Sequence, residues 1–175
     1  RRPTQGLLGQ VFNRGGVEVF TDIRKQQHFV PHIDQPPGVK VESEMLVTVH
    51  SPLLATIGMI QVCNKRKGGD GSAFEHNSFT PSDRDLLAHL AKDVSSAIEN
   101  ARVLKQMQER RMGLQGLKVV NTQFDTLRQL TYNLRDVLAC EHAKIVLVEE
   151  DSRQLMVPDF SARRMVFYPI GEGMI

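Results

Sequence analysis

Short runs of apolar and β-branched residues recur along the chain and predict a β-sheet. Turn residues separate the runs at 44–50 and 57–63, so we expect these two segments to pair as an antiparallel hairpin. A second hairpin is predicted from the runs at 145–148 and 155–157. The full set of predicted strands is 17–20, 44–50, 57–63, 145–148, 155–157 and a segment that begins at Met165.

Apolar residues at helical spacing predict helices between these strands. The longest helix begins with Thr80 as its N-cap, Pro81 at the first position, where a missing N–H costs nothing, and Asp83 at the positive end of the helix dipole. Its apolar spacing continues to Leu104 and Met107, which suggests a linker helix that pairs with a second copy of the chain. Two shorter helices are predicted at 6–12 and 124–138.

Asn64, Lys65, Phe79 and Asp83 follow one another around the third strand and the start of the long helix. This order resembles the N-K…F-x-x-x-D-E signature of GAF domains, the regulatory modules of cyclic-nucleotide phosphodiesterases and of some adenylyl cyclases. Arg84 stands where the family usually has Glu. The resemblance implies an α+β fold in which helices flank an antiparallel sheet. For Lys65 and Asp83 the pattern favours a structural ion pair and helix cap over contact with a ligand.

The same resemblance implies a ligand pocket. Gly6 begins a segment similar to the family's G-I-A-G pattern, and the free backbone N–H groups of Leu7 and Leu8 would offer a seat for phosphate. Residues 29–38 correspond to a lid, in which Asp34 matches the lid aspartate of the family. Gln61 matches a pocket position, although a solvent-facing residue on an alternating strand fits equally well. The candidate ligand-binding residues are Leu7, Leu8, Phe29, Val30, Asp34, Val41 and Gln61.

Three positions in the lid or just after it depart from the pattern of the members that bind cyclic nucleotides. Val30, Pro37 and Val41 stand where those members tend to carry Tyr, Thr and Thr. Each change removes a hydroxyl that could bind base, ribose or phosphate, at a net loss of about 0.5–1.5 kcal/mol. Together the three losses argue against a nucleotide ligand.

The order of the motifs predicts an unusual domain organisation. Gly173, Met174 and Ile175 repeat the pattern of Gly6, Leu7 and Leu8 at a distance of about one GAF domain with its linker. The expected division is the C-terminal two-thirds of one GAF domain at 1–103, a linker helix at 104–118, and the N-terminal third of the next domain at 119–175. The strands after residue 140 could complete the first sheet, in this chain or in a neighbouring copy. Alternatively, the chain is a piece of a longer tandem.

Composition excludes several classes of protein. A net charge of +2 and an aromatic content of 6% do not favour nucleic-acid binding. Cys63 and Cys140 are too few for a disulfide framework, and His28 and His32 lack a third metal ligand nearby. No apolar run reaches membrane-spanning length, so a cytoplasmic protein is expected. The chain contains no recognisable catalytic motif, so we expect a regulatory part of a signalling enzyme and not an enzyme in itself.

Two functions fit this pattern. In the first, the chain senses a small molecule such as cAMP or cGMP and relays binding through the linker helix to an output domain outside this chain. In the second, it is a ligand-free GAF domain that serves as a dimerisation and spacer element. Both expect a homodimer that forms through the linker helix.

Overall fold

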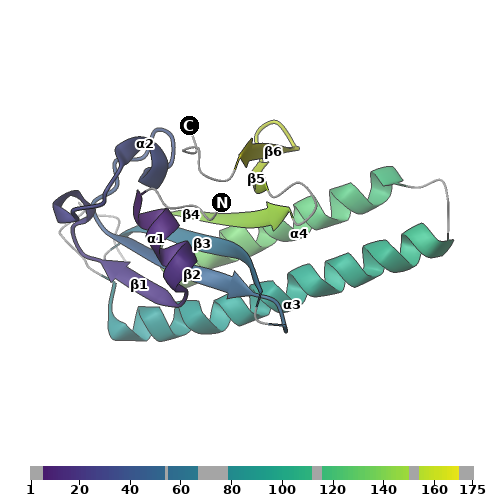
Figure 1. The fold of residues 1–175 in the computed structure, drawn as a ribbon, viewed down its shortest axis with the longest axis horizontal. Helices are drawn as coiled ribbons and strands as arrows, with labels where there is room; N and C mark the ends of the chain where they lie inside the picture. Colours follow the sequence, from purple (N-terminus) through teal and green to yellow (C-terminus); the bar gives the residue numbers. More distant parts are fainter. Residues whose placement is uncertain (1–5, 54, 67–78, 112–115, 150–153, 170–175) are drawn as a thin grey trace.

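The computed structural model describes residues 6–53, 55–66, 79–111, 116–149 and 154–169. Figure 1 shows a sheet with helices on both faces. In chain order the elements are α1 (Gly6–Arg14), β1 (Val17–Phe20), η1 (Ile23–Lys25), α2 (Pro31–Asp34), β2 (Glu44–His50), β3 (Thr56–Lys65), α3 (Pro81–Arg111), α4 (Gly116–Val137), β4 (Cys140–Glu149), β5 (Gln154–Asp159) and β6 (Arg164–Pro169).

The six strands form one antiparallel sheet in the order β1-β2-β3-β4-β5-β6. Its centre is the pairing of β3 with β4, whose register runs from Gly58 opposite Leu147 to Lys65 opposite Cys140. The strands after residue 140 therefore complete the sheet within the same chain. This is one of the alternatives that the sequence left open, and it confirms the expected α+β fold with helices flanking an antiparallel sheet.

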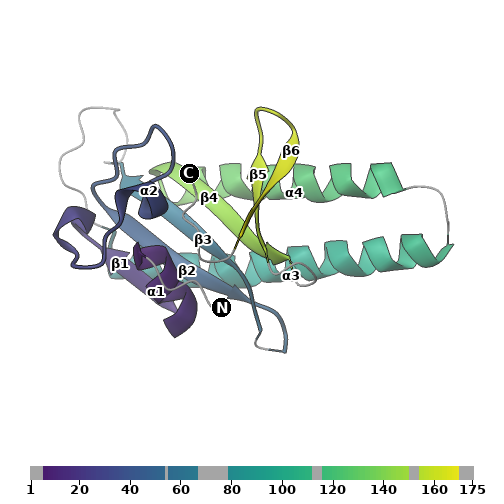
Figure 2. The ribbon, with the colours of Figure 1, turned by 45° about the horizontal axis from the view of Figure 1, so that its top comes forward.

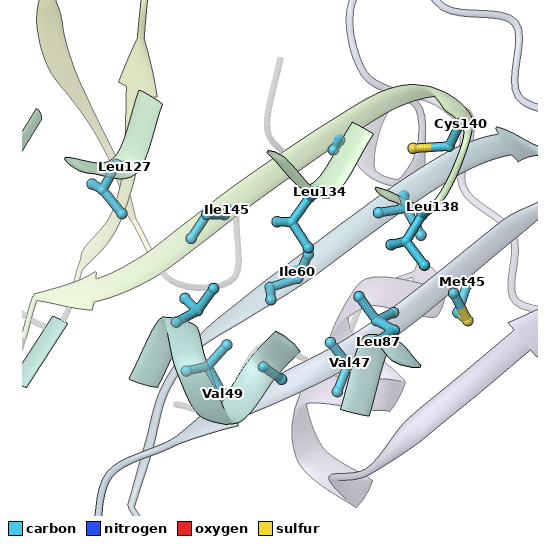
Figure 3. Close-up of a cluster of buried hydrophobic side chains, with 14 of the residues drawn as sticks. Met45, Val47, Val49, Ile60, Leu87, Leu127, Leu134, Leu138, Cys140 and Ile145 are labelled. Carbon is cyan, nitrogen blue, oxygen red and sulfur yellow. The ribbon is translucent and has the colours of Figure 1, made fainter. Parts of the chain in front are cut away.

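The helices α3 and α4 cover one face of the sheet, and the larger apolar cluster lies between these helices and the strands. Figure 3 shows how the side chains from both helices meet those of the three central strands. Alternate residues of each strand point toward this face, because successive side chains of a strand lie on opposite sides. The contributing residues drawn there include Met45, Val47, Val49, Ile60, Leu87, Leu127, Leu134, Leu138, Cys140 and Ile145.

The opposite face is covered by α1, α2 and the segment that follows α2 (Figures 1 and 2). A second apolar cluster fills the space beneath them, built around Leu7, Leu8 and Val11 from α1 and Leu46 and Met59 from the sheet. The same face of the strands also carries buried polar side chains, among them Glu44 and Gln61. The two faces of the sheet are therefore chemically different.

The helices α3 and α4 lie side by side, and their adjacent ends extend beyond the sheet (Figures 1 and 2). The predicted linker at 104–118 thus comprises the end of α3 and the start of α4, with residues 112–115 outside the described part of the chain. The division into 1–103, 104–118 and 119–175 stays a prediction. The repeated pattern at 173–175 also lies outside the described residues.

Several elements differ from the sequence expectation, and two of the differences have a clear local cause. The strand β4 begins at Cys140 instead of residue 145, because Ala139 adopts a left-handed φ of 45° and ends α4 in a single tight turn. The lid contains a short helix, α2, which begins with Pro31 at a helix-start position. Local apolar spacing contains no signal for either feature.

Gly58 offers a test of the central strand pairing. A Cβ atom at this position would lie 2.4 Å from the carbonyl oxygen of Val146 on β4, which is far inside contact distance. We expect Gly58→Ala to destabilise the fold by about 1–3 kcal/mol, because the two backbones must move apart. Chemical denaturation measures the loss, with the volume-conserving substitution Met59→Leu on the same strand as the control. An unchanged denaturation midpoint in Gly58→Ala would contradict this packing.

Candidate functional site

Lys65, at the end of β3, joins three elements. Its Nζ lies 2.6 Å from Asp83 Oδ1 and donates a hydrogen bond of 3.0 Å to the carbonyl oxygen of Leu138, just after α4. The other carboxylate oxygen of Asp83 accepts hydrogen bonds from the N–H and hydroxyl of Thr80, while that hydroxyl accepts from the N–H of Asp83. This is a reciprocal helix cap. The Lys65–Asp83 pair thus has the geometry of a structural clamp, and the ion pair and the cap hydrogen bonds lower the pKa of Asp83 against the opposing effect of burial.

Asn64 connects the lid to the sheet. It adopts a left-handed φ of 57°, which Asn tolerates better than most residues. Its Oδ1 accepts from the N–H of Glu42, and its Nδ2 donates to the carbonyl oxygen of Lys40 and to the Glu141 carboxylate. The end of the lid and the start of β4 are therefore held by one side chain.

Phe79, the remaining residue of this motif, is buried in the apolar cluster beneath α3. The four residues of the GAF-like motif thus stabilise the fold through hydrogen bonds, an ion pair and apolar packing.

Asp34 is the last residue of α2, and its carboxylate lies at the N-terminus of α1. Its Oδ1 accepts a 3.0 Å hydrogen bond from the N–H of Leu8, and its Oδ2 accepts a 2.7 Å bond from the N–H of Val30. The carboxylate lies so close to Gly6 that a Cβ atom there would be 2.5 Å from Oδ1. A side chain of the lid therefore fills the place where the sequence predicts a phosphate. Burial raises the pKa of Asp34, although the hydrogen bonds from Val30, Leu8 and Leu7 lower it.

Gln61 and Glu44 continue this polar group onto the sheet. The Nε2 of Gln61 donates to the backbone carbonyl of Asp34 at 2.7 Å and also to Oε1 of Glu44. Glu44 is fully buried, and its Oε2 has no hydrogen-bond partner within the described chain. Burial raises the pKa of Glu44 to about 8, opposed by the Gln61 hydrogen bond and reinforced by Asp34. Glu44 therefore carries a proton at neutral pH.

The candidate ligand residues do converge in the structure. Leu7, Leu8 and Val41 are buried in the second apolar cluster, while Phe29 and Val30 pack against its edge. Gln61 lies beneath the lid and donates a hydrogen bond to the backbone carbonyl of Asp34. The sequence did not indicate Glu44, although a lone acidic residue that begins an apolar strand is a signal for such a buried group.

Two open cavities lie near this region, and none of the candidate ligand residues lines either of them. One, of about 460 Å³, is bounded by the lid itself, from Pro31 and His32 to Gln35–Lys40. The other, of about 380 Å³, lies between α4, β4 and the β5–β6 hairpin. The apolar candidate residues instead pack within or against the second apolar cluster.

The described residues contain no group of three or more His, Cys, Asp or Glu side chains arranged to hold a metal ion. None of the helices within the described ranges is both long and apolar enough to cross a bilayer.

Several solved structures match the fold of this chain. No family model and no curated protein matches the chain. Among solved structures, it is similar to one from a phosphoenolpyruvate-protein phosphotransferase of Coxiella burnetii. That structure is a GAF domain. The identity is 14% and the TM-score 0.46, and the match covers 59% of this chain and 55% of that one. The sequence motifs described above resemble the same family.

Glu44→Gln tests the buried polar group. Because the pKa of Glu44 rises from 4.5 in the unfolded chain to about 8 in the fold, the folded state binds more protons between these values. Stability therefore falls as pH rises through this window, and the penalty is absent at low pH. Glutamine keeps the oxygen that accepts from Gln61 and cannot ionise, so the variant should gain stability relative to the wild type as pH increases.

The measurement is the free energy of unfolding of both proteins at pH values from about 5 to 8. Glu42→Gln, at a position before β2, is the matched control and should show no such divergence. A difference between Glu44→Gln and wild type that stays constant with pH would contradict a protonated Glu44.

Proposed function

We propose that this chain is a regulatory domain of the GAF type that acts as a dimerising spacer and does not bind cAMP or cGMP. The observation that carries the proposal is the Asp34 carboxylate on the N–H of Leu8. An anion that binds at the start of α1 needs the same donor, because the free N–H groups of a helix start are what bind anions there. The domain supplies its own anion.

A cyclic nucleotide would have to displace Asp34 before its phosphate could bind. Displacement breaks the hydrogen bonds from Leu8 and Val30 and leaves a buried carboxylate beside a second negative charge. Lost hydrogen bonds to a charged group cost about 1.5–3 kcal/mol each, and like charges in a partly buried site repel further. No hydroxyl at 30, 37 or 41 offsets this cost, and Val41 is buried among apolar side chains.

Calorimetric titration with cAMP and with cGMP tests the proposal. We expect neither nucleotide to give saturable heat with the wild-type chain at concentrations up to about 1 mM, which corresponds to a binding free energy weaker than about −4 kcal/mol. Micromolar binding of one nucleotide that disappears in Asp34→Ala but persists in Asp93→Ala would support the sensing function instead. Asp93 is an exposed carboxylate on α3 and controls for a general loss of negative charge. Circular dichroism establishes that each variant is folded.

The proposed spacer function depends on exposed apolar side chains near the C-terminal end of α3. Val103, Leu104 and Met107 lie in the last third of α3, and they are 46%, 56% and 57% exposed. Residues three and four apart share a helix face, so Val103 and Met107 form one apolar strip with Leu104 at its side. A second copy of the same helix offers a strip of matching chemistry, and pairing removes both strips from water. We therefore assign the dimer contact to this end of α3, with the output domain attached outside this chain.

Sedimentation equilibrium tests this contact. The wild-type chain should sediment as a dimer, and Leu104→Glu should shift it to a monomer because the charge would be buried in the interface. Leu86→Glu is the matched control, since Leu86 is a partly exposed leucine at the opposite end of the same helix. If both variants stay dimeric, or if the wild type is monomeric at micromolar concentration, α3 does not form the contact.

A further inference from the structure

The cavity beside β4 is formed by a change in the direction of the sheet. The strand β4 pairs with β5 only from Leu147 to Glu149, and the hairpin of β5 and β6 then leaves the line of β4 (Figures 1 and 2). The first half of β4, the hairpin, α4 and the Pro36–Pro37 segment of the lid enclose about 380 Å³. This volume lies at the lower end of the range for small-molecule sites, about 300–1,000 Å³.

Three basic side chains line this cavity from two elements: Arg135 on α4, and His142 and Lys144 on β4. The Nε of Arg135 and the Nε2 of His142 are buried, and neither has a hydrogen-bond partner among the residues that the structure describes. Buried polar atoms without partners are rare in folded proteins, because each one destabilises the fold. A ligand that accepts hydrogen bonds would remove this cost.

The electrostatics of the cavity also favour an anion. Burial lowers the pKa of Lys144 to about 8. The pKa of His142 is lowered first by burial and then by repulsion from Lys144 and Arg135. The charged form of His142 is therefore destabilised by its two basic neighbours, and a negative charge between the three side chains would reverse the effect.

Two carboxylates near the cavity, Asp159 and Glu141, make contacts with other groups. Asp159 also lines the cavity, but its Oδ1 accepts hydrogen bonds from Ser161 and from the N–H of Ala162, and its Oδ2 lies 3.8 Å from Arg164. Glu141, which precedes His142, receives the Asn64 side chain. Asp159 therefore stabilises a turn, and Glu141 accepts a hydrogen bond from the side chain that holds the end of the lid.

The remaining walls are apolar or aromatic, including Val157, Pro158, Phe160 and Tyr168. Such walls bind a flat apolar body, and a guanidinium pairs with a carboxylate in a fixed planar geometry. We propose that this cavity binds a small organic carboxylate with a flat apolar body, with the carboxylate at Arg135, His142 and Lys144. The site is separate from the start of α1, so it stands independently of whether the domain binds cyclic nucleotides.

Benzoate and benzamide form a matched pair of probes, because they share a flat ring and differ in charge. Amide resonances of the ¹⁵N-labelled chain are followed while each compound is added up to millimolar concentration. Benzoate should shift the resonances of β4 around Ala143–Ile145 and of Val157–Phe160, and benzamide should bind at least about tenfold more weakly. Cyclic AMP, titrated in parallel, should leave these resonances unchanged, so failure of this site and failure of the proposed function are read separately.

Arg135→Gln tests the assignment to the basic cluster. It should weaken benzoate binding about tenfold or more, whereas Arg128→Gln should leave it unchanged, since Arg128 is an exposed arginine on the same helix that pairs with Asp125. If Arg135→Gln fails to fold, the comparison of benzoate with benzamide on the wild-type chain still tests the proposal. Equal binding of benzoate and benzamide, shifts confined to other parts of the chain, or no shifts at all would overturn the proposal. Binding of inorganic phosphate in place of benzoate would overturn the apolar part of it.

Discussion

The pairing of β3 with β4 is the constraint on which the rest of the structure depends. It brings together segments on either side of a long helical excursion, so the entropy lost in closing this loop must be recovered by the contacts that closure allows. Those contacts are the apolar cluster under α3 and α4 and the clamp of Lys65 on Asp83 and Leu138. Without the pairing, β3 and β4 would each expose an unpaired edge and an apolar face. Closure within one chain removes both.

The second organising feature is the Asp34 carboxylate. It satisfies backbone donors from α1 and from the lid, and the backbone of the same residue accepts from Gln61 on the sheet. The lid is therefore fixed to the helix start and to the sheet at one residue. A site that is filled by a side chain differs from an empty site, because any ligand must first compete with a group tethered beside it, at high effective concentration.

Much of this fold follows from local sequence pattern. Strands such as Glu44–His50 and the cap at Thr80 are encoded by apolar runs and by turn and cap chemistry within a few residues. The contacts within the candidate site do not follow from such local patterns. That Asp34 reaches Leu8, or that Glu44 lies under Gln61, depends on segments that meet only after the sheet has formed. The residues around Arg135 and Lys144 were not indicated for the same reason, since they become neighbours through the departure of β5 from β4.

The difference between the two sheet faces explains where regulation could act. On antiparallel neighbours, residues directly opposite each other point to the same face, and Glu44, Cys63 and His142 form such a row across β2, β3 and β4. The face covered by α3 and α4 holds the larger apolar cluster, whose packing stabilises the fold. The other face holds Glu44 with a raised pKa and His142 with a lowered one, so burial favours the neutral form of both groups. A ligand or a change in pH that charges either group would change the energy of this face and leave the apolar core under α3 and α4 intact.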